Sequence, residues 1–309
     1  MSIQPEKKVT DKASQGVMGS RRNKAIVEHV AQAIFTVCAL AAIFAVASIT
    51  LYMIISGTPA IFKVGLKEIL FGTVWKPTAA EPRFGILYVI LTSIVGTTLA
   101  VLIGVPVGIL TAVFLAEIAD KRLAGIPSVI YGLLGIYLLN PLMYKLELKV
   151  FAGSKTHQFT GGANLLSAVI VLAIMILPTV INISETSIRA VHPSIKAASL
   201  ALGASHIQTI FKSILPAAKS GIVTAVVLGV GRAIGEAMAI TLVSGSSVNA
   251  PLPFNSVRFL TTAIVSEMGY SQGTHRQMLF TIGLVLFVFI MIINVVLNRI
   301  LKEGAKKDV

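Results

Sequence analysis

Two opposite charges, Arg232 and Glu236, lie four residues apart inside an apolar stretch that covers residues 220–243. An arginine guanidinium stays charged at working pH and can bind phosphate oxygens with paired hydrogen bonds. Ionisable groups at bilayer depth cost several kcal/mol and usually line the route of a substrate or ion. The pair therefore predicts a substrate or ion pathway. The alternative interpretation is a structural ion pair that locks two helices together.

The spacing of the pair predicts that both side chains point from the same face of one helix. Three glycines flank the pair, namely Gly229, Gly231 and Gly235. Glycines in membrane helices favour close helix packing, which we expect here, and the same glycines can ease bending during transport.

The composition indicates that these residues lie in an integral membrane protein. Mean hydropathy is +0.86, 55% of residues are hydrophobic and only 13% are charged. The net charge of +13 comes from basic residues scattered at the ends of apolar runs, which favours a role in topology over nucleic-acid binding. The single cysteine, Cys38, cannot form an intrachain disulfide.

Six apolar runs are long enough to cross a bilayer and predict an all-α polytopic fold. They cover residues 33–55, 86–116, 123–143, 165–188, 220–243 and 278–300. The second run exceeds a simple crossing and contains Pro106, so we expect a kink or a helix that extends beyond the bilayer. The expected domains are a basic tail (1–30), a transmembrane domain (31–303) and a C-terminal tail (304–309).

The distribution of Lys and Arg predicts the orientation of these spans. With the N-terminus inside, sixteen of them fall on the cytoplasmic side and nine on the opposite side. The positive-inside rule then places both termini in the cytoplasm.

Residues 189–217 form the longest polar connection expected on the cytoplasmic side. Pro193 can open a first helix, Gly203 interrupts it, and a second helix ends near Pro216. The exposed apolar residues expected on these helices are Leu200, Leu202, Ile207 and Phe211. This shape would fit a groove on a partner protein, or would rest on lipid as an interfacial helix.

The same loop resembles the EAA loop of ABC importer permeases, whose pattern is Glu-Ala-Ala, three residues, Gly, nine residues, and Ile-x-Leu-Pro. Gly203, Leu215 and Pro216 match this pattern. The first three positions are Ala197, Ala198 and Ser199, so alanine stands where the family has glutamate, and Ser213 stands at the isoleucine position.

Four further segments extend the resemblance over residues 34–300. They read FGTVWKP (71–77), GVPVGILTAVFLAE (104–117), IPSVIYGLLG (126–135) and GRAIGEAMAI (231–240). Together they resemble the PstC-type permeases of bacterial phosphate ABC importers. The resemblance implies a type I importer fold, a multi-pass location in the bacterial inner membrane, and a coupling loop at 189–217.

The resemblance also implies the partners. No G-x-x-x-x-G-K-[ST] loop occurs, so ATP and Mg²⁺ would be used by a separate cytoplasmic ATP-binding subunit, and this chain would hold no cofactor. A second permease would complete the pathway, and an extracytoplasmic binding protein would deliver inorganic phosphate. In that setting Arg232 would contact the anion. Glu236 would either hold Arg232 in the resting state or accept the proton of a hydrogen phosphate.

Three alternatives use the same residues differently. Sulfate or molybdate could replace phosphate, and an ATP-independent channel or secondary transporter could use Arg232 but would leave the 189–217 loop unexplained. A membrane enzyme lacks support, because we expect all five histidines outside the spans and find no paired acidic motif. We therefore expect neither a catalytic site nor a metal site.

Overall fold

The computed structural model describes residues 9–117, 127–154 and 156–306, and it divides into two compact units, Met1–Ile55 and Ser56–Val309. Taken by itself, the described part of the first unit is a single helix, the portion of α1 (Val9–Val64) that precedes Ser56. Its side chains from residue 27 onward are almost all exposed and mostly apolar, as in a helix that faces lipid. Residues 1–8 of the expected basic tail lie outside the described residues.

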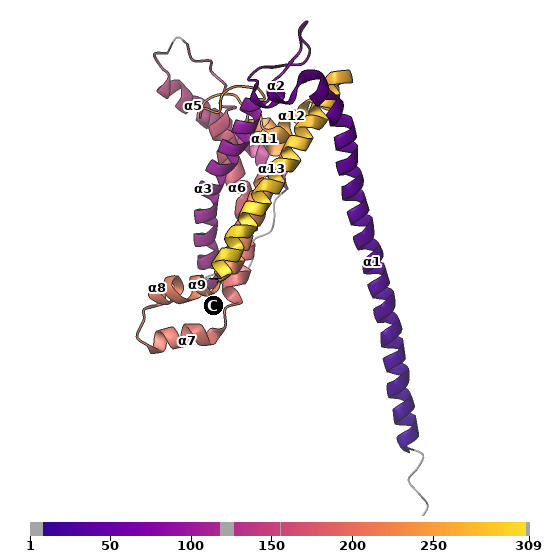
Figure 1. Ribbon diagram of the computed structural model, residues 1–309. Helices are drawn as coiled ribbons and strands as arrows, with labels where there is room; N and C mark the ends of the chain where they lie inside the picture. The colour runs from indigo at the N-terminus through magenta and orange to yellow at the C-terminus, as the bar shows by residue number, and fades with distance from the viewer. Residues whose placement is uncertain (1–8, 118–126, 155, 307–309) are drawn as a thin grey trace, which may run out of the picture. The chain divides into compact units, whose positions relative to one another are not determined.

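The second unit is almost entirely helical (Figure 1). Its long helices are α3 (Leu87–Glu117), α6 (Leu165–Arg189), α10 (Lys219–Gly235) and α13 (Gly273–Lys306). The shorter ones are α2 (Leu66–Phe71), α4 (Ser128–Leu134), α5 (Asn140–Val150), α7 (Pro193–Ala201), α8 (His206–Thr209), α9 (Leu215–Ala217), α11 (Met238–Val243) and α12 (Leu260–Glu267). Two π-helical turns, η1 (Gly135–Leu139) and η2 (Ile210–Ile214), continue α4 and α8, and strands β1 (Trp75–Lys76) and β2 (Arg83–Phe84) form a small antiparallel hairpin.

Helix α6 lies at the centre of this unit, between α3 and α10. A Cβ atom on Gly108 of α3 would lie 2.8 Å from Val180 Cγ1, and one on Gly229 of α10 would lie 2.9 Å from Val180 Cγ2. Gly104 approaches α6 equally closely, since a Cβ atom there would lie 2.7 Å from Ile176 Cδ1. These glycines let three helix backbones approach closely, so a single valine of α6 contacts both neighbours.

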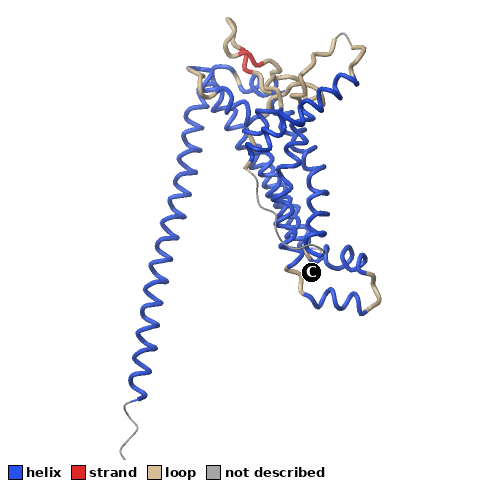
Figure 2. The backbone as a smooth tube through the Cα atoms, turned by 180° about the vertical axis from the view of Figure 1, so that it is seen from behind, coloured by secondary structure: helices blue, strands red, loops and turns tan. Residues whose placement is uncertain are grey.

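The short elements gather at the two ends of the long helices. Helices α7, α8 and α9 lie at one end, while α2, the β-hairpin and α5 lie at the other (Figures 1 and 2). The expected alternation of connections across a membrane requires this separation, because residues 56–85, 144–164 and 244–277 should face the side opposite to 189–217.

The predicted fold class is confirmed. Among the described residues, five helices are long and apolar enough to cross a membrane, or six if a bent pair counts as one span. The second predicted run is the single helix α3, which is 31 residues long. At 1.5 Å per residue it measures about 46 Å, so it extends beyond a hydrocarbon layer of about 30 Å.

The third predicted run differs from the structure at its end. Its first residues fall in 118–126, outside the described part, but the helix does not stop at Met143 and continues through α5 to Val150. Polar residues on this extension, Lys145 and Lys149, obscure the helix when the sequence is judged by hydropathy. Pro141 in the first turn of α5 is compatible with a helix that continues, because the first turn needs no proline N–H.

Candidate functional site

The apolar stretch 220–243 is not one continuous helix, and the prediction that both charges lie on one face of a single helix was wrong. Helix α10 ends at Gly235, Glu236 has an extended backbone (φ −73°, ψ 129°), and α11 begins at Met238. Arg232 and Glu236 therefore do not share one helical face. They lie on the two sides of a break in the helix.

Local hydrogen bonds explain the break. The Glu236 carboxylate accepts a hydrogen bond from the backbone N–H of Ala239 (3.1 Å), and so caps the start of α11. The Thr261 hydroxyl donates to the backbone carbonyl of Glu236 (2.7 Å). Non-helical peptide groups at membrane depth need such partners within the protein. In this conformation Glu236 caps α11 and does not hold Arg232.

Arg232 lies in the last turn of α10, where a positive charge complements the helix dipole. Its side chain is exposed, and it forms no ion pair with any residue in the part of the chain that the structure describes. An exposed and unpaired guanidinium beside a helix break can accept an anion from outside the chain.

The three flanking glycines have different surroundings. Gly229 is buried against Val180, so it serves helix packing inside this chain. Gly231 and Gly235 are exposed, and a Cβ on either would meet no described atom within 4 Å. They leave an open surface on both sides of Arg232.

The loop at 189–217 has the helix-glycine-helix form that its sequence predicts. Gly203 follows α7 with φ +83°, a conformation that favours glycine, and Ser205 and Gln208 form a capping box at the start of α8. The helical run His206–Ala217 meets Lys219–Gly235 at an angle of 71°, just after Pro216. The loop is therefore continuous with the helix that carries Arg232.

Some polar side chains of this loop form hydrogen bonds or an ion pair within the unit, while other side chains are exposed. Ser199 Oγ lies 3.0 Å from Thr209 Oγ1 and accepts a hydrogen bond from Ser213, which joins α7 to α8 and η2. Lys196 pairs with Glu117 at the end of α3. The exposed positions of the EAA-like pattern are Ala197, Ala198, Gly203 and Pro216, while Ser199 and Leu215 are half-buried.

Apolar side chains dominate the outward surface of the loop. Leu202 is 89% exposed, Ile207 70% and Phe211 53%. A hollow of about 690 Å³ lies beside Gly203 and Leu202. Another hollow, of about 770 Å³, lies at the opposite end of the unit. Exposed apolar groups around a hollow are typical of a protein-docking surface.

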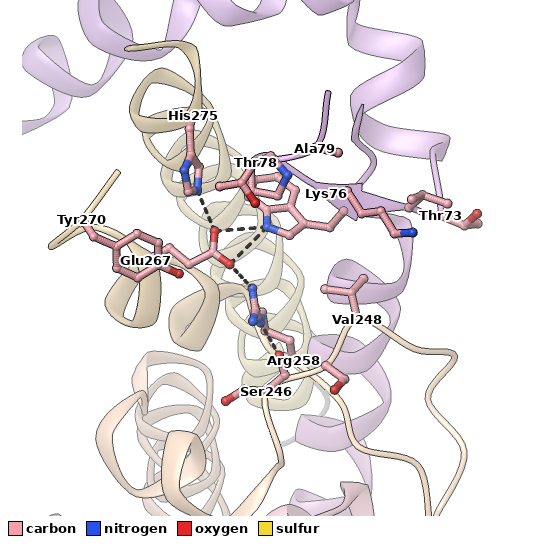
Figure 3. A pocket seen from close by; sticks show the side chains of 14 residues that line it. Thr73, Lys76, Thr78, Ala79, Ser246, Val248, Arg258, Glu267, Tyr270 and His275 are labelled. Carbon is pink, nitrogen blue, oxygen red and sulfur yellow. Dashed lines mark hydrogen bonds and ion pairs between the residues drawn. The ribbon is translucent and has the colours of Figure 1, made fainter. Parts of the chain in front are cut away.

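The hollow at the opposite end contains a polar network that the sequence did not predict (Figure 3). At its base the buried Glu267 carboxylate accepts hydrogen bonds from Trp75 Nε1 (3.2 and 3.1 Å) and pairs with Arg258. His275 Nε2 lies 2.7 Å from the same carboxylate. Tyr270 lies beside it, and partial burial raises the pKa of its phenol, as does the negative charge of Glu267.

A second buried carboxylate, Glu147, was missed as well. It lies 2.8 Å from His157 Nε2 and accepts hydrogen bonds from the backbone N–H (3.0 Å) and hydroxyl of Thr160. A signal was present in the sequence, since Glu147 lies only four residues beyond the predicted apolar run 123–143. No group of three or more His, Cys, Asp or Glu among the described residues could hold a metal ion.

Comparisons with known proteins agree with this architecture. Residues 104–303 match the family model described as "Binding-protein-dependent transport system inner membrane component". The "Probable ABC transporter permease protein YqgH" of Bacillus subtilis is 37% identical over 306 residues, covering 93% of this chain and 96% of that protein. The "Phosphate transport system permease protein PstC" of Haemophilus influenzae is 29% identical and covers 90% of this chain and 94% of its own length.

A third relative and a solved structure are also similar to this chain. The "Probable phosphate transport system permease protein PstC" of Methanocaldococcus jannaschii is 31% identical, with 85% of this chain and 91% of that protein covered. An inward-facing structure of the MetNI methionine ABC transporter aligns with 71% of this chain and 94% of its own chain, at 19% identity and a TM-score of 0.48.

The resemblance to PstC-type permeases that the sequence motifs indicated is confirmed by these relatives. The helical fold, the membrane spans and the family match agree with one another. The chain belongs to the family of inner membrane components of binding-protein-dependent transport systems.

Proposed function

We propose that this chain is a permease subunit of an ATP-driven importer of inorganic phosphate, with Arg232 as the residue that contacts the anion in the membrane. The observation that carries the proposal is the state of Arg232, which is exposed and without an ion pair among the described residues, beside a break in its helix. Relatives named for phosphate transport support the choice of anion.

The proposal assigns the other tasks to partners. A cytoplasmic subunit that uses ATP and Mg²⁺ docks on the exposed apolar surface of the 189–217 loop, and a second permease covers the open surface beside Gly231 and Gly235. An extracytoplasmic binding protein delivers phosphate to the opposite end. Both termini then lie in the cytoplasm, on the side of the loop.

Substitution of Arg232 in the assembled transporter tests this function. In proteoliposomes that contain the complete complex, we expect Arg232→Gln to abolish uptake of radiolabelled phosphate while complex formation and ATP hydrolysis persist. The matched control is Arg276→Gln, because Arg276 is an exposed arginine at the outer end and is given no role in the pathway. Near-normal uptake by Arg232→Gln would contradict the assignment.

Competition between unlabelled oxyanions and radiolabelled phosphate for uptake identifies the transported anion. We expect unlabelled phosphate to inhibit uptake, while equal concentrations of sulfate and molybdate have little effect. Strong inhibition by sulfate or molybdate would retain the permease but replace its substrate.

A further inference from the structure

Helix α12 joins two polar sites that lie at its opposite ends. Thr261, in its first turn, donates a hydrogen bond to the backbone carbonyl of Glu236 at the break between α10 and α11. Glu267, its last residue, is the carboxylate that binds Trp75, Arg258 and His275 in the hollow at the end opposite to the loop. Six residues separate them, or about 9 Å along a helix axis.

Glu267 holds together three segments that are far apart in the chain. Trp75 belongs to β1, Arg258 to the connection before α12, and His275 to the first turn of α13. Arg258 also donates through Nε to the carbonyl of Ser246 (2.8 Å), in the connection that follows α11. The same carboxylate therefore fixes the far end of α12 and, through Arg258, the segment after α11.

The body of α12 has little freedom to absorb a displacement. The side chains of Leu260, Thr262 and Ala263 are buried, and the backbone N–H of Leu260 donates to Ser93 Oγ of α3 (2.9 Å). Closely packed elements move as units and transmit small shifts to their neighbours. A change in the Glu267 network is thus passed along α12 to the hydrogen bond between Thr261 and Glu236.

We propose that Glu267 and Thr261 are positioning residues for transport. They set the backbone conformation at Glu236. This conformation in turn sets how far Arg232, on the other side of the break, is exposed. The hollow beside Glu267 would thereby be connected mechanically with Arg232, the proposed contact of the anion. The relevance to transport rests on the proposed function, but the positioning itself can be measured without phosphate or ATP.

The test uses the single cysteine of the chain. In a Cys38→Ser background, Met238→Cys places a thiol directly after the break, at a position where the methionine is 59% exposed. The rate of its modification by a charged methanethiosulfonate reagent is measured on the full chain in nanodiscs. We expect Thr261→Val to raise this rate by about fivefold, the factor that corresponds to the loss of one hydrogen bond. Glu267→Gln should raise the rate as well.

Two controls separate positioning from general loosening of the fold. Leu202→Cys reports on the distant loop, and its modification rate should stay unchanged in both variants. Thr261→Ser keeps the hydroxyl and should restore the original rate at position 238. If Glu267→Gln fails to fold, the modification rate at position 238 in Thr261→Val is by itself the test of the proposal.

The proposal is overturned if the rate at position 238 does not change in Thr261→Val, or if the rates at 238 and 202 rise together. A failure of Arg232→Gln to affect uptake would refute the transport assignment but would leave these rates unaffected. The two proposals therefore fail in different experiments.

Discussion

The side chains of Glu147, Glu236 and Glu267 are buried or half-buried, and each is engaged by groups of the same chain. Glu147 accepts from Thr160, Glu236 from Ala239 and Glu267 from Trp75. Arg232 has no ion-pair partner among the described residues. Burial of a charge is tolerated when hydrogen bonds compensate its desolvation. At the scale of single residues, the surroundings of Arg232 therefore leave it available to a ligand.

Glu147 should contribute to stability more than to transport. Its side chain is fully buried, and Glu147→Gln weakens the acceptor for the Thr160 N–H and hydroxyl. Loss of about 2 kcal/mol corresponds to a fall of about 4–8 °C in the midpoint of thermal unfolding in detergent. Glu81→Gln, on an exposed residue of the hairpin loop, is the control and should leave the midpoint unchanged. Identical midpoints for both variants would contradict this account.

At the scale of elements, the loop around Gly203 depends on one backbone conformation. A residue with a Cβ meets no described atom within 4 Å there, so strain at φ +83° is the main penalty. Valine at such a φ costs about 1–2 kcal/mol, whereas asparagine adopts it more readily. We expect Gly203→Val to reduce copurification of the ATP-binding subunit by about 5–30-fold. Gly203→Asn should retain most of it.

The comparison of these two variants is informative because both add a side chain at the same place. Equal loss in both would indicate that the surface itself, and not the backbone conformation, matters at this position. Unchanged copurification in both would remove Gly203 from the docking surface.

The long helices could be predicted from the sequence because apolar runs identify them directly. The predicted run 165–188 corresponds to α6 (Leu165–Arg189), and the helix-glycine-helix loop follows from Pro193 and Gly203. The break after Gly235 could not be located this way, since the apolar run continues past it to Val243 and three glycines, Gly229, Gly231 and Gly235, give no single end point. It depends on a hydrogen bond from Thr261, which lies 25 residues further along the chain.

The Glu267 network escaped prediction for a related reason. Its members come from β1, the connection before α12, and α13, and no spacing along the chain relates them. His275 was expected outside the spans, but α13 begins at Gly273 and includes it. Local patterns identify helices, whereas convergence of distant segments becomes visible only in the folded chain.

At the scale of the whole second unit, the two ends carry different chemistry. One end exposes the apolar loop surface with the hollow beside Gly203, and the other holds the hollow beside Glu267 and the buried carboxylates of Glu147 and Glu267. The orientation of these ends in the membrane can be measured in a Cys38→Ser background. We expect a membrane-impermeant maleimide to label Leu202→Cys only in inverted vesicles and Thr78→Cys only in intact spheroplasts, as the positive-inside rule requires. The reverse pattern would place the termini outside.

The 71° bend between the loop and α10 has a simple geometric consequence. Helix α10 has 17 residues and so is about 25 Å long. A rotation of about 10° around the bend would carry its far end through about 4 Å, which exceeds the length of a hydrogen bond of about 3 Å. If Arg232 contacts an anion as proposed, a small angular change at the loop would therefore be enough to make or break the hydrogen bonds between them. On that proposal, the length of α10 would convert a few degrees of rotation at the loop into the capture or release of one ion.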